Sequence, residues 1–384
     1  TSGSADFSNY VAVGASFTAG FTDGGLFIAS QENSFPNILA KEFAKVGGGE
    51  FKQPLMSDNS GGILVGGNVA RGYRQTFNSA TARPESLDVF LNGLGAPVPP
   101  ITTEAGVNIG SDFNNFGIPA AKSWHLIAPG YAGANPYYAR IASAPTATVL
   151  GDAMAQNPTF FTLSEVGGND VLGYALSGGD GSNPITPSAG PPGVGFDESF
   201  GFLIATLTSG IAKGVATNVP YVKDLPHFTT VVYNQLDPND PSIGPILIPQ
   251  IPALNAQLYG PLDGIFTAFG EPDRINPLSA TEANPLLIIF GKARQATSND
   301  LVVLTAAGAI AAIVPGVPAP VNVRGISYPM EDKWVLIPEE QEEIKTATDA
   351  YNATISSVVV ANENVALVDL NAILTEVATT GVNF

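Results

Sequence analysis

One serine near the start of the chain stands where parallel α/β proteins place reactive groups. Ser16 follows a short apolar run, residues 10–13, whose β-branched and aromatic character predicts a buried strand. In open α/β sheets, ligands bind at the C-terminal ends of strands, and the amides of a following helix can stabilise negative charge. The pattern therefore indicates nucleophilic chemistry at Ser16. A plain Gly/Ser turn between a strand and a helix is the alternative reading of the same residues.

The spacing around this serine resembles the first sequence block of the SGNH (GDSL) hydrolase family, Gly-Asp-Ser-Leu-Thr-x-Gly. The matching positions are Gly14, Ser16, Thr18 and Gly20, whereas Ala15 and Phe17 depart from the pattern. The resemblance implies an ester hydrolase in which Ser16 is the nucleophile and its own N–H contributes to the oxyanion hole.

A second stretch, residues 115–121, resembles the second block of this family, Asn-x-Gly-x-x-Gly-Ala. Ala120 occupies the position of the second glycine, whose backbone N–H is an oxyanion-hole donor in the family. The resemblance implies the same role for Ala120, on the condition that its φ angle is negative. An ordinary strand-to-helix turn is the alternative here.

The third stretch is the most specific of the three. An apolar run ends at Gly167, and Asn169 and Asp170 then complete the Gly-x-Asn-Asp pattern of the third SGNH block. The resemblance implies that the Asn169 side-chain amide is an oxyanion donor, which is typically worth ~3 kcal/mol in the transition state. We expect Asp170 to fix the turn rather than to touch the substrate. The three blocks occur in the family order over residues 10–172.

The catalytic base is the open question of the sequence. A serine hydrolase needs a base for the serine proton and a carboxylate that orients this base. The family takes both from an Asp-x-x-His block near the C-terminus, and no such pattern follows the last predicted strand in this sequence. The one Asp-x-x-His in residues 1–384 is Asp224 to His227, which lies in the expected insertion. Three interpretations compete. Our main expectation is a missing C-terminal tail that carries the block; the others are relocation of the role to His125 or His227, and a degenerate, non-catalytic domain.

Composition excludes several other classes of protein. The chain of 384 residues has a net charge of −18 without a Lys/Arg cluster, which argues against binding to nucleic acid. It has no cysteine and two histidines, so we expect no thiolate chemistry and no His-rich metal site. The ester hydrolysis that the resemblance implies needs neither a metal nor an organic cofactor. The longest apolar run, residues 301–314, is shorter than the ~20 residues that span a bilayer.

The low charged fraction of 13% and a small, polar start are typical of exported proteins. Residues 1–8 resemble the tether that follows the processing site of a bacterial lipoprotein. We therefore expect an extracytoplasmic protein, either an outer-membrane lipoprotein at the cell surface or a periplasmic protein. A lipid anchor or an outer-membrane protein partner fits this location, and the oligomeric state stays open.

Alternating strand and helix patterns predict an α/β fold with a mostly parallel sheet. The resemblance refines this to a three-layer α/β/α, flavodoxin-like domain over residues 9–384, with residues 177–300 as a Pro-rich insertion or cap. The expected elements include helices at 34–46 and from Pro338, a strand then a helix over 301–314, a last strand at 365–370 and long loops over 50–112.

Together these patterns predict a serine ester hydrolase for an acyl-ester or lipid-like substrate. The apolar residues 236–273 favour such a substrate, because they can form an apolar wall. The alternative is a non-catalytic cell-surface binding or accessory lipoprotein that belongs to an outer-membrane complex.

Overall fold

The computed structural model describes residues 3–80, 83–241, 243–290 and 292–381, which form two compact units. Unit 1 comprises Thr1–Asp170, Thr186–Pro220 and Thr348–Ile373, and unit 2 comprises Val171–Ile185, Tyr221–Ala347 and Leu374–Phe384. Residues 177–185 and 221–300 of the expected insertion belong to unit 2, whereas residues 186–220 belong to unit 1.

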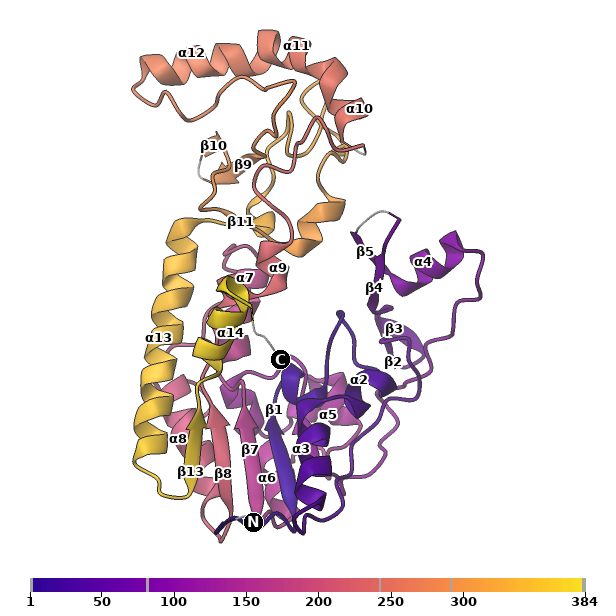
Figure 1. Cartoon of the computed structure of the whole chain (residues 1–384), viewed down its shortest axis with the longest axis vertical. Helices are drawn as coiled ribbons and strands as arrows, with labels where there is room; N and C mark the ends of the chain where they lie inside the picture. Colours follow the sequence, from indigo (N-terminus) through magenta and orange to yellow (C-terminus); the bar gives the residue numbers. More distant parts are fainter. Residues whose placement is uncertain (1–2, 81–82, 242, 291, 382–384) are drawn as a thin grey trace. The chain divides into compact units, whose positions relative to one another are not determined.

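Unit 1 is built on a five-stranded sheet in the order β13-β8-β7-β1-β6 (Figure 1). All four strand pairings are parallel, which confirms the predicted α/β class with a parallel sheet. The strands are β1 (Tyr10–Gly14), β6 (Asn115–Gly117), β7 (Phe160–Ser164), β8 (Lys213–Thr217) and β13 (Val365–Val368). The order brings β1, β6 and β7 together, although more than 90 residues separate β1 from β6 in the chain.

The positions of β1 and β7 inside the sheet explain why their sequences are nearly continuous apolar runs. Every residue of β1 and of β7 is buried, because each strand has a neighbour on both edges and both of its faces are covered. Tyr10 begins β1 in a cluster of aromatic rings that includes Phe43 and Phe160. Its hydroxyl is also satisfied, by a 2.8 Å hydrogen bond with Thr162 Oγ1 on β7.

The other elements of unit 1 are short, apart from two helices. The expected helix at 34–46 is confirmed as α3 (Phe35–Ala44), although the Ser34 hydroxyl donates to Gln53 Oε1 instead of capping it. Residues 50–112 were predicted as long loops, but they also form two hairpins and a helix. The remaining elements are α1 (Ser16–Ala19), α2 (Ile28–Glu32), β2 (Ile63–Val65), β3 (Asn68–Arg71), β4 (Gln75–Asn78), β5 (Arg83–Ser86), α4 (Leu87–Gly93), η1 (Ser123–Ile127), η2 (Tyr131–Gly133), α5 (Pro136–Ala139), α6 (Val149–Ala155) and α8 (Phe196–Leu207).

Three of the five chain boundaries between the units lie within helices: α7 (Gly168–Leu176), α13 (Pro338–Val360) and α14 (Leu370–Thr379). The helix predicted from Pro338 is confirmed, with proline first and acidic residues in its first turn. Its buried stripe runs through Ile344, Tyr351 and Ile355 and ends at Val359. The last predicted strand is confirmed as β13.

Unit 2 is made of small sheets and short helices. The apolar run 301–314, predicted as a strand and a helix, forms only the two-residue β11 and one 3₁₀ helix, η6. The strand is short because Val302 pairs with Val335, the first residue of its antiparallel partner β12, and η7 (Asp332–Trp334) directly precedes that residue. The elements are η3 (Val222–Asp224), α9 (Pro226–Thr229), α10 (Gly244–Leu247), η4 (Ile248–Gln250), α11 (Ile251–Leu254), η5 (Asn255–Tyr259), α12 (Gly260–Ala268), β9 (Leu287–Phe290), β10 (Lys292–Gln295), β11 (Leu301–Val302), η6 (Leu304–Gly308), η7 (Asp332–Trp334) and β12 (Val335–Leu336).

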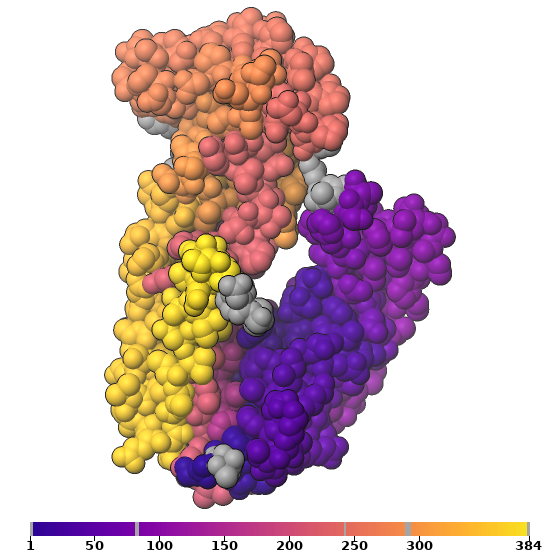
Figure 2. Space-filling view, in the orientation of Figure 1, coloured from indigo at the N-terminus to yellow at the C-terminus, as the bar shows by residue number. Residues whose placement is uncertain are grey.

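The residues from α10 to α12 lie at the surface of unit 2 and are drawn in salmon in Figure 2. Apolar side chains are exposed along this segment, including Ile246 and Ile265, and Phe269 just beyond α12 is 82% exposed. Among the residues described here, none of the helices combines the length and the apolar character needed to cross a membrane.

Candidate functional site

Ser16 lies at the C-terminal end of β1, where it begins the single-turn helix α1. The side chain is half-buried, and its Oγ accepts a hydrogen bond from the Ala120 N–H at 3.4 Å. Ala120 follows β6, which pairs with β1 in parallel, so the two residues meet at the same edge of the sheet. The structure thus brings together two of the three residues singled out from the sequence.

The structure requires Gly14 and Gly20 of the first block for different reasons. A Cβ atom on Gly14 would lie 2.2 Å from Thr18 Oγ1 and 2.6 Å from the Ser164 carbonyl oxygen, so no side chain fits there. Gly20 ends α1 with a φ of +87°, a left-handed conformation that glycine adopts without cost. These two residues allow the chain to turn sharply on either side of Ser16.

Ala120 adopts a φ of +65°, so the condition of a negative φ is not met. Its N–H nevertheless points to Ser16 Oγ, because the orientation of an N–H is set by the preceding peptide plane rather than by the side chain. The left-handed conformation costs a residue with a Cβ about 1–2 kcal/mol. Ala120 is therefore strained next to the candidate nucleophile, as residues at functional sites often are.

Asn169 lies at the start of α7 and is attached to the loop that carries Ala120. Its Nδ2 donates to the Ala121 carbonyl oxygen at 2.9 Å, which uses one of its two amide hydrogens. Among the described residues, no hydrogen bond joins Asn169 to Ser16 directly. Asp170 is buried, and its carboxylate accepts hydrogen bonds from the N–H and hydroxyl of Ser123 at 2.8 and 2.7 Å. Asp170 thus holds the start of α7 against η1.

Glu165 is the residue of this site that the sequence reasoning missed. One carboxylate oxygen accepts from the Ala15 N–H at 2.7 Å and from the Thr18 N–H at 3.1 Å. The other oxygen accepts from the Ser164 hydroxyl at 3.0 Å and from the Thr18 hydroxyl at 3.4 Å. Burial raises the pKa of Glu165 to about 7, and these hydrogen bonds oppose that rise. Its own φ is +50°, a second strained conformation beside Ser16.

Among the described residues, no base forms a hydrogen bond with Ser16. The one hydrogen-bond partner of Ser16 Oγ among them is the Ala120 N–H. His125 is unsuited to the role, because its Nδ1 accepts the Lys122 N–H at 3.0 Å. A neutral imidazole in that arrangement carries its proton on Nε2, the atom that would have to accept the serine proton. Burial, together with the charge of Lys122, lowers the pKa of His125 to about 4.

His227, the other candidate for a relocated base, belongs to unit 2. Its Nε2 is buried and has no hydrogen-bond partner in the described part of the chain, and its ring meets Phe228 edge-on. Burial lowers its pKa. These features are those of a packed, neutral histidine.

A cavity of about 410 Å³ borders the site, with Ala120 and His125 in its lining. The lining also includes Arg71, Tyr131 and Tyr137. The His125 ring stacks on Tyr131 with centroids 4.3 Å apart, which makes this wall rigid. A cavity of this volume accommodates a small-molecule ligand.

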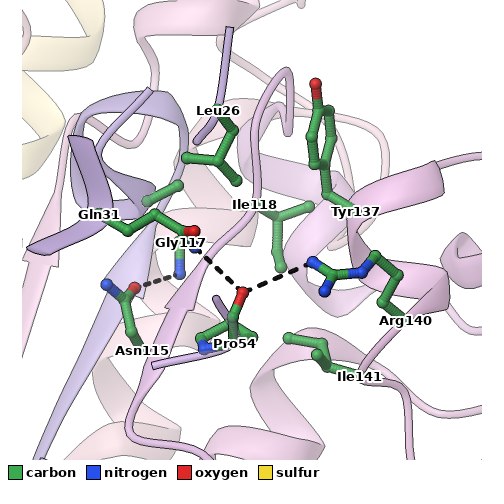
Figure 3. Close-up of a pocket in the computed structure, with 10 residues that line it drawn as sticks. Leu26, Gln31, Pro54, Asn115, Gly117, Ile118, Tyr137, Arg140 and Ile141 are labelled. Atoms are coloured by element: carbon green, nitrogen blue, oxygen red, sulfur yellow. Dashed lines mark hydrogen bonds between the residues drawn. The ribbon is translucent and has the colours of Figure 1, made fainter. Parts of the chain in front are cut away.

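A second void, of about 10 Å³, lies inside the unit and has room for about one water molecule (Figure 3). Arg140 borders it and is almost fully buried. Its guanidinium donates to the carbonyl oxygens of Leu55, at 2.7 Å, and Pro54. Figure 3 shows Gln31 donating to the same Pro54 oxygen, so these side chains fix the chain at residues 54–55.

No protein-family model, curated protein or solved structure matches this chain in the three comparisons. Within residues 3–80, 83–241, 243–290 and 292–381, no group of three or more His, Asp or Glu side chains can hold a metal ion. The functional argument therefore rests on the geometry around Ser16.

Proposed function

We propose that this protein is a serine ester hydrolase whose unit 1 has the three-layer α/β/α arrangement of SGNH hydrolases. The observation that carries the proposal is the 3.4 Å hydrogen bond from the Ala120 N–H to Ser16 Oγ at the C-terminal edge of a parallel sheet. An N–H beside the nucleophile can also donate to the oxygen of a carbonyl that the nucleophile attacks. Two strained residues, Ala120 and Glu165, flank this serine and support a functional role.

In the proposed reaction, Ser16 Oγ forms a bond to the carbonyl carbon of an ester and gives its proton to a base. The oxyanion receives the Ala120 N–H, the Ser16 N–H and the second amide hydrogen of Asn169. When the intermediate collapses, the C–O bond to the alcohol breaks and the alcohol leaves with the proton from the base. Water then attacks the acyl-enzyme and releases the acid, which regenerates the Ser16 hydroxyl.

The proposal requires a base from outside the described residues, as an Asp-x-x-His segment in a longer gene product would provide. We test it by labelling the full-length gene product with a fluorophosphonate, which reacts with activated serines. We expect labelling that Ser16→Ala abolishes and that Ser209→Ala, at an exposed serine outside the site, leaves intact. A full-length product that takes up no label would overturn the enzyme proposal.

The substrate class and location are part of the same proposal. The proposed substrate is an acyl or lipid-like ester, and the charged fraction of 13% favours an outer-membrane lipoprotein or a periplasmic protein. A lipid anchor or an outer-membrane protein would then be its partner. Extraction of the native protein with membranes, and its release by detergent, would test the anchored form.

A second candidate function is a non-catalytic binding or accessory lipoprotein at the cell surface. Two observations favour it: Ala15 replaces the aspartate of the family pattern, and Ser16 Oγ meets no base among the described residues. The intact mass of the natural protein, with mapping of its C-terminus, separates the two functions. A tail that contains Asp-x-x-His supports the hydrolase, and a natural end at Phe384 supports the binding protein.

A further inference from the structure

The lining of the 410 Å³ cavity beside Ser16 combines one cation with an unpartnered hydroxyl. Arg71, at the end of β3, contributes a permanently charged guanidinium. None of the described residues that line the cavity carries a carboxylate, although the protein as a whole has 34 acidic side chains against 16 basic ones. A cation in a lining without a carboxylate points to a negatively charged ligand.

The guanidinium is held in place without being neutralised. It donates to the Gly24 carbonyl oxygen at 2.9 Å and lies over the Phe21 ring, 5.1 Å from its centroid. No ion pair of Arg71 is formed within the described residues. A guanidinium has five N–H donors in a planar fork, so Arg71 retains donors that match a carboxylate.

Tyr137 provides the second, independent observation. The residue is 91% buried, and its hydroxyl has no hydrogen-bond partner in the described part of the chain. Figure 3 shows the hydroxyl directed away from Arg140 and the small void. Burial raises the pKa of Tyr137, and the charge and the guanidinium donors of Arg71 oppose this rise. Arg71 and Tyr137 both line the cavity, so the two side chains can meet one ligand there. A buried hydroxyl without a partner is unfavourable, and a ligand oxygen that accepts its hydrogen bond removes this cost.

We propose that Arg71 and Tyr137 form an anion-binding subsite and that the substrate is a small ester bearing a carboxylate. The carboxylate accepts the Arg71 fork and the Tyr137 hydroxyl, while the ester group reaches the Ala120 N–H in the same cavity. One part of this inference rests on the proposed function, namely that the bound anion belongs to an ester. Anion binding itself needs no hydrolysis.

The test therefore measures binding with amides, which the reaction does not consume. Calorimetry compares the monoanilides of succinic, glutaric and adipic acid with the neutral butyric, valeric and caproic anilides. We expect at least one acidic anilide to bind roughly 10–100-fold more tightly than its neutral match. Arg71→Ala and Arg71→Gln should both abolish this preference, and Tyr137→Phe should reduce it several-fold.

Arg74→Ala is the matched control, because Arg74 also donates to a carbonyl and lies over a ring, Phe27, but does not line the cavity. It should leave the preference intact. Equal binding of acidic and neutral anilides, no binding of either series, or a preference that survives in both Arg71 variants would overturn the proposal. The Ser16→Ala variant should bind the anilides as the wild type does. The binding result therefore remains valid even if fluorophosphonate labelling fails.

Discussion

The carboxylate of Glu165 accepts the Ala15 N–H at 2.7 Å and thereby fixes the residue that precedes the candidate nucleophile. The same oxygen accepts the Thr18 N–H, so the two ends of the Ser16 turn are attached to one side chain. This attachment matters because α1 has only four residues and few hydrogen bonds of its own. Glu165 therefore acts on Ser16 as a positioning residue.

Replacing Glu165 by glutamine should change how stability depends on pH. The folded pKa of Glu165, about 7, lies above its ordinary value of 4.5. Its contribution is therefore fully present below pH 4.5 and is lost as pH rises through 7, by ~3 kcal/mol in total. Urea unfolding between pH 4 and 8 should show that wild type loses more stability than Glu165→Gln over this interval. Glu363→Gln, at an exposed glutamate, should follow the wild type; parallel profiles for wild type and Glu165→Gln would contradict the prediction.

The elements around Ser16 could be predicted from sequence because their signals are local. The buried strand before Ser16, the strand before Gly167 and the helix from Pro338 all follow from runs of apolar residues and from end signals within a few positions. Glu165 could not be found in this way. Its role depends on the parallel register that sets Ser164 beside Gly14, and hence Glu165 beside Ala15, 150 residues away in the chain.

Two errors have the same origin in tertiary structure. The run 301–314 has the apolar content of a strand and a helix, yet the length of β11 is limited by its short partner. The left-handed φ of Ala120 was not expected, because alanine usually avoids that conformation. In both cases, neighbours that are distant in sequence override the local preference. The base for Ser16 is not found among the described residues, and so the sequence expectation of a missing segment stays a prediction.

Ala120→Gly should stabilise the protein by about 1 kcal/mol, because glycine removes the penalty of a Cβ at φ +65°. The N–H that faces Ser16 Oγ is retained, so the rate of fluorophosphonate labelling of an active enzyme should change little. Urea unfolding measures the free energy of unfolding. Ala121→Gly is the control, because Ala121 has no positive φ and should lose stability instead. A loss of stability in Ala120→Gly would show that the methyl group contributes more by packing than it costs in strain.

The Asn169→Ala variant tests whether the Asn169 side chain is an oxyanion donor or has a structural role alone. Loss of the hydrogen bond to the Ala121 carbonyl should cost about 1 kcal/mol of stability. If the second amide hydrogen stabilises the oxyanion, the labelling rate should also fall by roughly 10²–10³-fold. Asn33→Ala is the matched control, since Asn33 also donates its amide to a carbonyl, that of Ala29, on the surface. Equal labelling rates for the two variants would remove Asn169 from the proposed oxyanion hole.

His125 should remain neutral down to about pH 4, with its proton on Nε2. With two histidines in the chain, nitrogen-detected NMR resolves both rings, and His227→Gln assigns them. The folded pKa of His125 lies below its ordinary value of 6.5, so its contribution to stability is present above pH 6.5 and is lost as pH falls through 4. Protonation of Nδ1 would break the hydrogen bond from the Lys122 N–H, and η1, which includes His125, would loosen. A measured pKa near 6.5, or a proton on Nδ1 at neutral pH, would instead leave Nε2 free to accept a proton. That outcome would make His125 a candidate base within the cavity that it shares with Ala120, and Ser16 would need no segment beyond those described.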